Sequence, residues 1–121
     1  MELVVLAAAR FWTADELWAV HRDRASDLGL GADLIAAIAE QRMPSGASAD
    51  EALVYAFAGE LLTQGRAHDD TFAPSVSRFG YQTVVELVGV AGFYSMVALT
   101  LNAFETLPAH GRTSLPRFPR A

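Results

Sequence analysis

The chain has 121 residues, 52% of them hydrophobic, with a formal net charge of −5 at pH 7 and a sequence pI near 5.0. An acidic chain with nine basic residues in all is a poor candidate for binding nucleic acid or an anionic membrane surface. It contains no cysteine, so disulfides, thiolate nucleophiles, zinc–thiolate sites and thiol redox chemistry are excluded.

Residues 2–12 predict a short apolar helix that begins almost at the start of the sequence, so we expect residues upstream of it to be missing. The next helix is predicted to begin at a capping box, in which Thr13 caps the helix and Glu16 reaches back to the Thr13 backbone. A glycine pair beginning at Gly29 should end this helix and turn the chain. Its predicted inward-facing stripe consists of Leu17, His21, Ala25 and Leu28.

The middle of the sequence predicts three further helices separated by polar loops, and no strand pattern is present. The first covers residues 33–42. Ser48 and Glu51 form a second capping box, which opens a longer helix. Either Asp69 or Asp70 is expected to cap the third helix, because aspartate accepts well from the free N–H groups of a helix start.

The organising element of the sequence is residues 81–104, which read YQTVVELVGVAGFYSMVALTLNAF. This proline-free stretch is apolar on nearly every side and predicts a helix of roughly 36 Å. One narrow stripe of small residues would let another helix approach closely, and this small-residue stripe is Ala91, Ser95, Ala98 and Asn102. A second stripe places one carboxylate among apolar groups, and it consists of Glu86, Val90, Phe93, Val97 and Phe104.

The sequence therefore predicts an all-α fold of about six helices, with a helical domain of residues 1–107 and an extended tail of residues 108–121. A small domain cannot cover the long C-terminal helix by itself, so other copies of the chain or lipid must bury it. We favour other copies, because Glu86 would be costly in a bilayer and no basic cluster flanks the helix. We expect a cytoplasmic homo-oligomer with no nucleic-acid or membrane partner.

Two candidate residues for chemistry lie on one predicted helix. His21 falls in an apolar stripe, where it is either a general acid/base tuned by burial or a core histidine bonded to a neighbour. Glu16 could orient it, but residues five apart on a helix are separated by about 140°. The capping box also accounts for Glu16 without any catalytic role.

Three other candidates lie elsewhere, and each again has a structural alternative. Glu2 is either a proton relay or a solvated helix end, and Glu86 either contacts substrate or pairs with a buried cation. Arg10 either holds a substrate carboxylate or complements the dipole at a helix C-terminus. The three histidines are too scattered for a zinc signature, so we expect neither a metal nor another cofactor.

Three segments resemble the carboxymuconolactone decarboxylase family in order and spacing. The family's final helix is similar to RFGYQTVVELVGVAGFYSMVALTLNAFETLP, its helix hairpin to ELVVLAAARFWTADELWAVHRDRASDLGL, and its connecting helix to SADEALVYAFAGELL. The resemblance covers nearly the whole chain apart from the arginine-rich tail. It implies an alkylhydroperoxidase D-like helical bundle, assembled into trimers or hexamers.

The resemblance also implies a site and a reaction. In the alkylhydroperoxidase D-like branch the motif is Glu, then Cys-x-x-Cys, then His, and its Glu and His fall on Glu2 and His21. The cysteine positions fall on Ala14 and Leu17, so thiol peroxidase chemistry is excluded, and Glu16 stands where the decarboxylase-like branch usually has Glu. The implied function is cofactor-free decarboxylation, or related lyase or isomerase chemistry, of a small carboxylated lactone. The alternative is a non-catalytic oligomer that binds a small hydrophobic acid.

Overall fold

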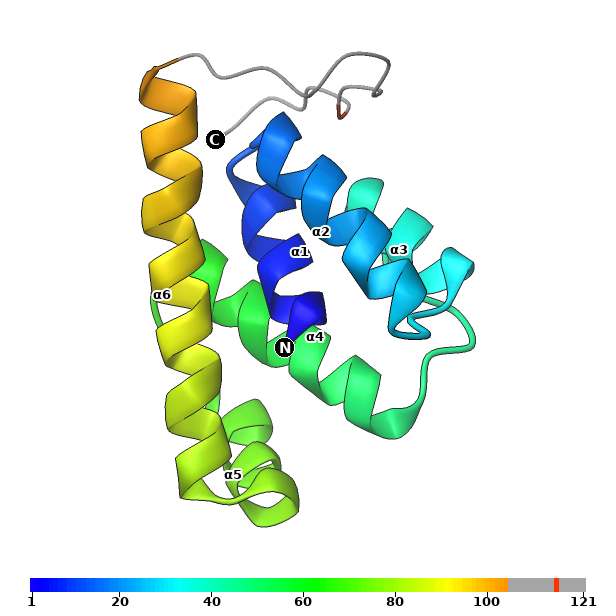
Figure 1. Ribbon diagram of the computed structural model, residues 1–121. Coiled ribbons are helices and arrows are strands. Elements are labelled where there is room, and N and C mark those ends of the chain that lie inside the picture. Colours follow the sequence, from blue (N-terminus) through cyan, green and yellow to red (C-terminus); the bar gives the residue numbers. More distant parts are fainter. Residues whose placement is uncertain (105–114, 116–121) are drawn as a thin grey trace.

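The computed structural model describes residues 1–104 and Leu115, and this part of the chain contains six helices and no strand (Figure 1). The helices are α1 (Glu2–Phe11), α2 (Asp15–Asp27), α3 (Ala32–Ala39), α4 (Ala49–Gln64), α5 (Asp69–Phe79) and α6 (Tyr81–Ala103). The predicted all-α fold with a long apolar C-terminal helix is confirmed. The predicted tail, 108–121, lies outside the described residues except for Leu115.

Helix α1 is at the centre of the fold, with α2, α3, α4 and α6 packed against it (Figure 1). Every residue from Leu3 to Arg10 is buried. The sequence of this stretch explains the burial, because a helix that is apolar on every side must be covered on every side, and its alanines let neighbouring helices approach closely. Both ends of this buried helix carry charged residues, Glu2 at the start and Arg10 in the last turn.

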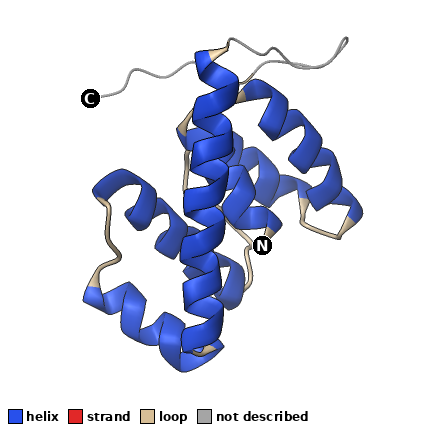
Figure 2. Ribbon diagram, turned by 60° about the vertical axis from the view of Figure 1, so that its left-hand side comes forward, coloured by secondary structure: helices blue, strands red, loops and turns tan. Residues whose placement is uncertain are grey.

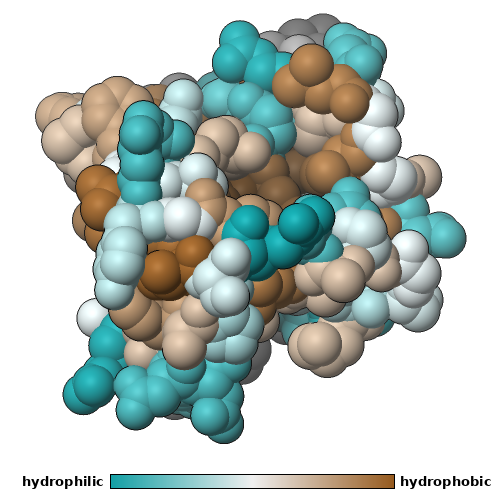
Figure 3. Space-filling model, turned by 90° about the horizontal axis from the view of Figure 1, so that it is seen from below, coloured by the Kyte–Doolittle hydropathy of each residue, from teal (hydrophilic) through white to brown (hydrophobic). Residues whose placement is uncertain are grey.

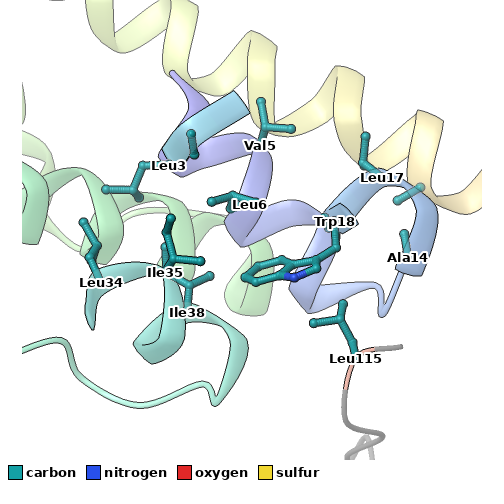
Figure 4. Close-up of a cluster of buried hydrophobic side chains, with 13 residues drawn as sticks. Leu3, Val5, Leu6, Ala14, Leu17, Trp18, Leu34, Ile35, Ile38 and Leu115 are labelled. Atoms are coloured by element: carbon teal, nitrogen blue, oxygen red, sulfur yellow. The ribbon is translucent and has the colours of Figure 1, made fainter. Parts of the chain in front are cut away.

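Two apolar clusters hold the other helices against α1. The larger includes Leu6 of α1, Trp18 of α2 and Ile38 of α3 (Figure 4). The smaller joins Val4 of α1 to Phe57 of α4 and to the first half of α6. Full burial of each such side chain contributes about 1.5–3 kcal/mol relative to leaving it in water, so these clusters fix the positions of both ends of α1.

The turn between α1 and α2 departs from the predicted capping box. Thr13 has a φ of 51°, in the left-handed region, whereas an N-cap residue usually has extended backbone. The Thr13 N–H donates to the Arg10 carbonyl at 3.1 Å and the Ala14 N–H to the Ala9 carbonyl at 2.8 Å. This is the Schellman pattern, so Thr13 ends α1 and does not begin α2. The N-cap of α2 is Ala14, without a side-chain cap.

The two other predicted caps have different outcomes. The capping box of α4 is confirmed, because the Ser48 hydroxyl accepts from the Glu51 N–H and the Glu51 carboxylate accepts from the Ser48 N–H. The prediction that Asp69 or Asp70 caps α5 is wrong, since both lie in its first turn and His68 is the N-cap residue.

A carboxylate on α4 stabilises the start of α5 instead of a local cap. Glu60 Oε1 accepts from the His68 N–H at 2.7 Å, and Glu60 Oε2 accepts from the Thr71 hydroxyl at 2.7 Å. Burial acts to raise the pKa of Glu60, but these two hydrogen bonds and the nearby His68 ring outweigh it and hold the pKa below its usual value.

Helix α6 lies along one side of the bundle, in front of the other helices in the view of Figure 2. Its small-residue stripe is the packing surface, as predicted: Ala91 and Ala98 are buried, and the Ser95 hydroxyl accepts from Trp12 Nε1 at 2.9 Å. The Asn102 side chain donates to the Trp12 carbonyl at 2.7 Å. By its length and composition α6 could also cross a membrane, a property that it shares with core helices of soluble proteins.

Another face of α6 is exposed in the part of the chain that the structure describes. We define the α6 outer face as its five exposed apolar residues that follow helical spacing: Tyr81, Val85, Val88, Met96 and Leu99. Phe93 and Phe104 are exposed beside it. Apolar surface also appears between hydrophilic side chains when the molecule is viewed from below (Figure 3). Among the described residues, α6 therefore carries a helix-long apolar surface that is exposed to solvent.

Leu115 is the part of the expected tail that the structure describes. Its side chain is buried with the larger apolar cluster (Figure 4), and its N–H donates to Asp15 Oδ1 at 2.7 Å. The buried Asp15 carboxylate thus binds a backbone group from the far end of the chain. A buried carboxylate needs such donors, because its desolvation is otherwise uncompensated.

Candidate functional site

The first turn of α1 and the middle of α2 bring Glu2 and His21 together. His21 Nδ1 lies 2.7 Å from Glu2 Oε2. His21 is 6% exposed, and the side chain of Glu2 is 17% exposed. The local turn explains the contact, because the left-handed Thr13 reverses the chain and α2 runs back along α1 towards Glu2.

The predicted inward-facing stripe of α2 is correct at three of its positions. Leu17, His21 and Ala25 are buried, one turn apart on the same face. Leu28 was predicted to share this face, but it is 73% exposed. The reason is that α2 ends at Asp27 and Leu28 is its C-cap, where the helical spacing no longer applies.

Two further residues, one from α6 and one from α2, contact the Glu2–His21 pair. The Tyr94 ring of α6 meets the His21 ring edge-on, with centroids 5.2 Å apart and an interplanar angle of 73°. Arg24 Nη1 lies 3.8 Å from Glu2 Oε1, although the Arg24 side chain is largely exposed. Arg24 could have been found from the sequence, since it lies three residues after His21 on the same helix. No sequence signal pointed to Tyr94, which comes from α6.

The geometry fixes which imidazole nitrogen can react. When Glu2 is ionised, its carboxylate only accepts hydrogen bonds, and Nδ1 of His21 is then the nitrogen that carries the proton between them. The other ring nitrogen, Nε2, is then the atom that can take a proton when the ring is neutral or give one when it is charged. A carboxylate that orients an imidazole through Nδ1, with Nε2 as the nitrogen that transfers the proton, is the arrangement expected of a general acid/base.

The other predicted site residues lie elsewhere. Glu16 is half-buried in the first turn of α2, and the carboxylate that binds His21 is that of Glu2. Glu86 is exposed on α6, where its Oε1 accepts from the Gln82 side chain at 3.3 Å. Arg10 is fully buried at the other end of α1, about 12 Å along the helix axis from Glu2. The structure thus joins two of the five candidates.

Arg10 instead forms part of the wall of a pocket of about 910 Å³. Its Nε donates to the Ala39 carbonyl at 2.7 Å, and its Nη1 donates to the Thr13 hydroxyl at 3.1 Å. The described residues that line this pocket include Tyr55 and Glu60 of α4 but neither Glu2 nor His21. Burial raises the pKa of Tyr55, against a smaller opposing effect of Arg42, so its phenol stays protonated at neutral pH.

Comparison with protein-family models, with curated proteins and with solved structures finds no match for this chain.

Proposed function

We propose that the protein is a carboxymuconolactone decarboxylase-like acid/base protein, in which Glu2 and His21 act without a cofactor on a small carboxylated lactone. The observation that carries this proposal is the 2.7 Å contact between His21 Nδ1 and Glu2 Oε2. The family resemblance places its motif Glu and His at these two positions. The contact supports that assignment, because the α1–α2 hairpin brings the carboxylate and the imidazole within hydrogen-bonding distance.

The proposed reaction assigns one role to each of the two residues. The bond between the substrate carbon and its carboxylate breaks, neutral CO₂ leaves, and the electron pair remains on the carbon as an enolate. His21, as imidazolium, donates the Nε2 proton to that carbon, and the neutral ring later takes up a proton from solvent. Glu2 holds the ring in one orientation and stabilises its charged form, as a carboxylate does beside a catalytic histidine. Apolar surroundings favour the step, because they disfavour the charged carboxylate relative to CO₂.

The same proposal includes a cytoplasmic homo-oligomer, a trimer or hexamer. The support is the α6 outer face, which a soluble protein would need to cover. Tyr94, on the packing side of α6, touches His21, so α6 itself lies between the α6 outer face and the candidate site.

The test is a lactone decarboxylation assay on the wild type and three variants. We expect His21→Gln to lose about 10²–10⁴-fold in kcat, the usual contribution of a general acid or base. Glu2→Gln should lose about 10–100-fold, since it removes a charge-assisted hydrogen bond but keeps the side-chain shape. The matched control is Arg24→Gln, which removes an exposed charge 3.8 Å from Glu2 and should change turnover little.

Turnover is compared only between variants whose size-exclusion mass and helical circular dichroism equal those of the wild type, so that a loss of activity does not reflect a loss of fold or assembly. Turnover by His21→Gln equal to that of the wild type would refute the assignment of the acid/base. Absence of turnover by the wild type on carboxylated lactones would refute the proposed reaction.

A further inference from the structure

Two glycines in the middle of α6 are not explained by the packing of the described chain. Gly89 and Gly92 lie three residues apart, so they face the same way, and both are exposed. A Cβ atom built on either one would meet no heavy atom within 4 Å beyond the adjoining helix backbone. Glycine is also the least favourable residue in a helix interior after proline. Close approach of a second backbone to this side of α6 would explain both glycines, because only glycine leaves room for such contact.

The α6 outer face is arranged symmetrically about Gly92, which is the middle residue of the helix. Val88 and Met96 lie four residues before and after this glycine. Val85 and Leu99 lie seven residues before and after it. At about 100° per residue, all four lie within roughly 40° of Gly92 around the helix. A second α6 that runs in the opposite direction and crosses at Gly92 would therefore meet apolar side chains at matching levels.

The single charge of α6 favours an antiparallel pair over a parallel one. Glu86 is the only charged residue of this helix, and it lies six residues from Gly92, so it points about 120° away from the centre of the outer face. Two parallel copies would place both Glu86 carboxylates at the same level. Antiparallel copies that cross at Gly92 separate them by about 18 Å along the axis, more than twice the screening length of about 8 Å at physiological ionic strength.

We propose that two copies of the chain pair through the α6 outer face as antiparallel helices that cross at Gly92 on a two-fold axis. Val88 of each copy then packs against Met96 of the other, which is the self-complementary contact of a two-fold interface. The pair rests on the homo-oligomer of the proposed function and is independent of the proposed reaction. It selects the hexamer over the trimer, because a closed ring of three has no two-fold axis.

Introduced cysteines can report the direction of the pair, because the chain contains none of its own. The double variant Val88→Cys/Met96→Cys should form covalent dimers on oxidation, read on a denaturing gel, since each new thiol faces the other kind across the axis. Both positions are exposed, so the core is not disturbed. Each single variant should form almost no dimer, because two copies of one position lie about 12 Å apart along the axis, beyond the roughly 7 Å between Cα atoms that a disulfide spans.

Gly92→Leu tests the close approach at the crossing. Leucine is a better helix former than glycine and its side chain has open space in the described chain, so helical circular dichroism should be kept. Overpacking at the crossing should raise the dissociation constant of the pair by about tenfold or more, measured by size exclusion with light scattering on dilution. The matched control is Ala52→Leu, at an exposed position of α4, which should dissociate like the wild type.

The wild-type mass should be an even multiple of the 13.0 kDa chain. A mass of three chains would overturn the two-fold pair, as would dimers from a single cysteine variant at the level of the double variant, no dimers from the double variant, or an unchanged dissociation constant in Gly92→Leu. These results would leave the homo-oligomer of the proposed function standing. A wild type that is monomeric at every concentration, or that stays in solution only with detergent, would overturn the pair and the homo-oligomer together.

Discussion

The link between Glu60 and the start of α5 allows the sharpest prediction about stability. The perturbation is Glu60→Gln, which keeps the size of the side chain and removes its charge. Both oxygens of Glu60 accept short hydrogen bonds, at 2.7 Å each, and its side chain is 18% exposed. Gln offers one acceptor oxygen in place of two and turns an amide donor towards one of the two former partners.

The expected cost follows from the geometry. A hydrogen bond to a charged group contributes about 1.5–3 kcal/mol, and a neutral one about 0.5–1.5 kcal/mol. Because the side chain is partly exposed, we take the lower value of about 1.5 kcal/mol for each charged bond and about 1 kcal/mol for the neutral one. The replacement should then lower the free energy of unfolding by about 2 kcal/mol. With a urea dependence of about 1–3 kcal/mol per molar, the unfolding midpoint should fall by roughly 0.7–2 M. Protein concentration must be held constant, because any oligomer makes the midpoint concentration-dependent.

Asp50→Asn is the matched control, because Asp50 is the other carboxylate of α4 that binds α5. It forms an ion pair with Arg78 at 2.7 Å, and the Asp50 side chain is 46% exposed. The hydrogen bond from Arg78 is the main cause that lowers the pKa of Asp50, yet exposed pairs of this kind contribute little to stability. A midpoint shift in Glu60→Gln no larger than that in Asp50→Asn would show that the hydrogen bonds of Glu60 do not stabilise the α4–α5 contact.

The pH dependence of the same variant has a definite sign. The pKa of Glu60 is lower in the folded chain than in the unfolded one, so its contribution is present above the unfolded value of about 4.3. That contribution is lost as the pH falls through the folded pKa. The difference in stability between wild type and Glu60→Gln should therefore be constant near neutral pH and shrink below about pH 4.5. A difference that grows on acidification would contradict this account.

Two further predictions concern α6. Ser95→Ala leaves the Trp12 indole N–H without its acceptor, and it should lower the free energy of unfolding by about 1–2 kcal/mol, measured by urea unfolding; no change would mean that water replaces the hydroxyl at no cost. Met96→Glu places a charge on the α6 outer face without touching the core, so it should lower the size-exclusion mass of the proposed oligomer while helical circular dichroism is kept; an unchanged mass would move the interface away from this face.

The positions of the helices could be predicted from the sequence because each depends on local signals. Hydrophobic spacing located all six helices, and the Ser48 box was correct because its two hydrogen bonds join residues three apart in sequence. Thr13 and Glu16 have the same kind of capping-box pattern, but this box does not form. Thr13 instead ends α1 in a left-handed conformation. Local motifs do not reveal which of two adjacent helices will use a residue.

The candidate site was harder to predict from the sequence, because its contacts join residues on different helices. Spacing on α2 correctly placed His21 inward, but it put Glu16 about 140° away and so identified no partner for His21 on the same helix. The actual partner is Glu2, and only the family resemblance indicated it. Glu60 shows the same difficulty, since it replaces a cap that was expected from Asp69 or Asp70. Side chains that bridge helices depend on packing angles that no single-helix pattern encodes.

The different lengths of α1 and α6 explain why charged side chains are held in largely buried surroundings at both ends of α1. Both helices are apolar on nearly every side, but α1 has ten residues and α6 has 23. Four neighbouring helices bury the short helix from Leu3 to Arg10, whereas the long one is buried along one stripe. Glu2 is thus mostly buried and Arg10 fully buried, and polar partners offset their loss of water: His21 contacts Glu2, and Ala39 and Thr13 accept from Arg10. The Glu2–His21 contact that carries the proposed function is therefore a consequence of burying a short helix with charged ends.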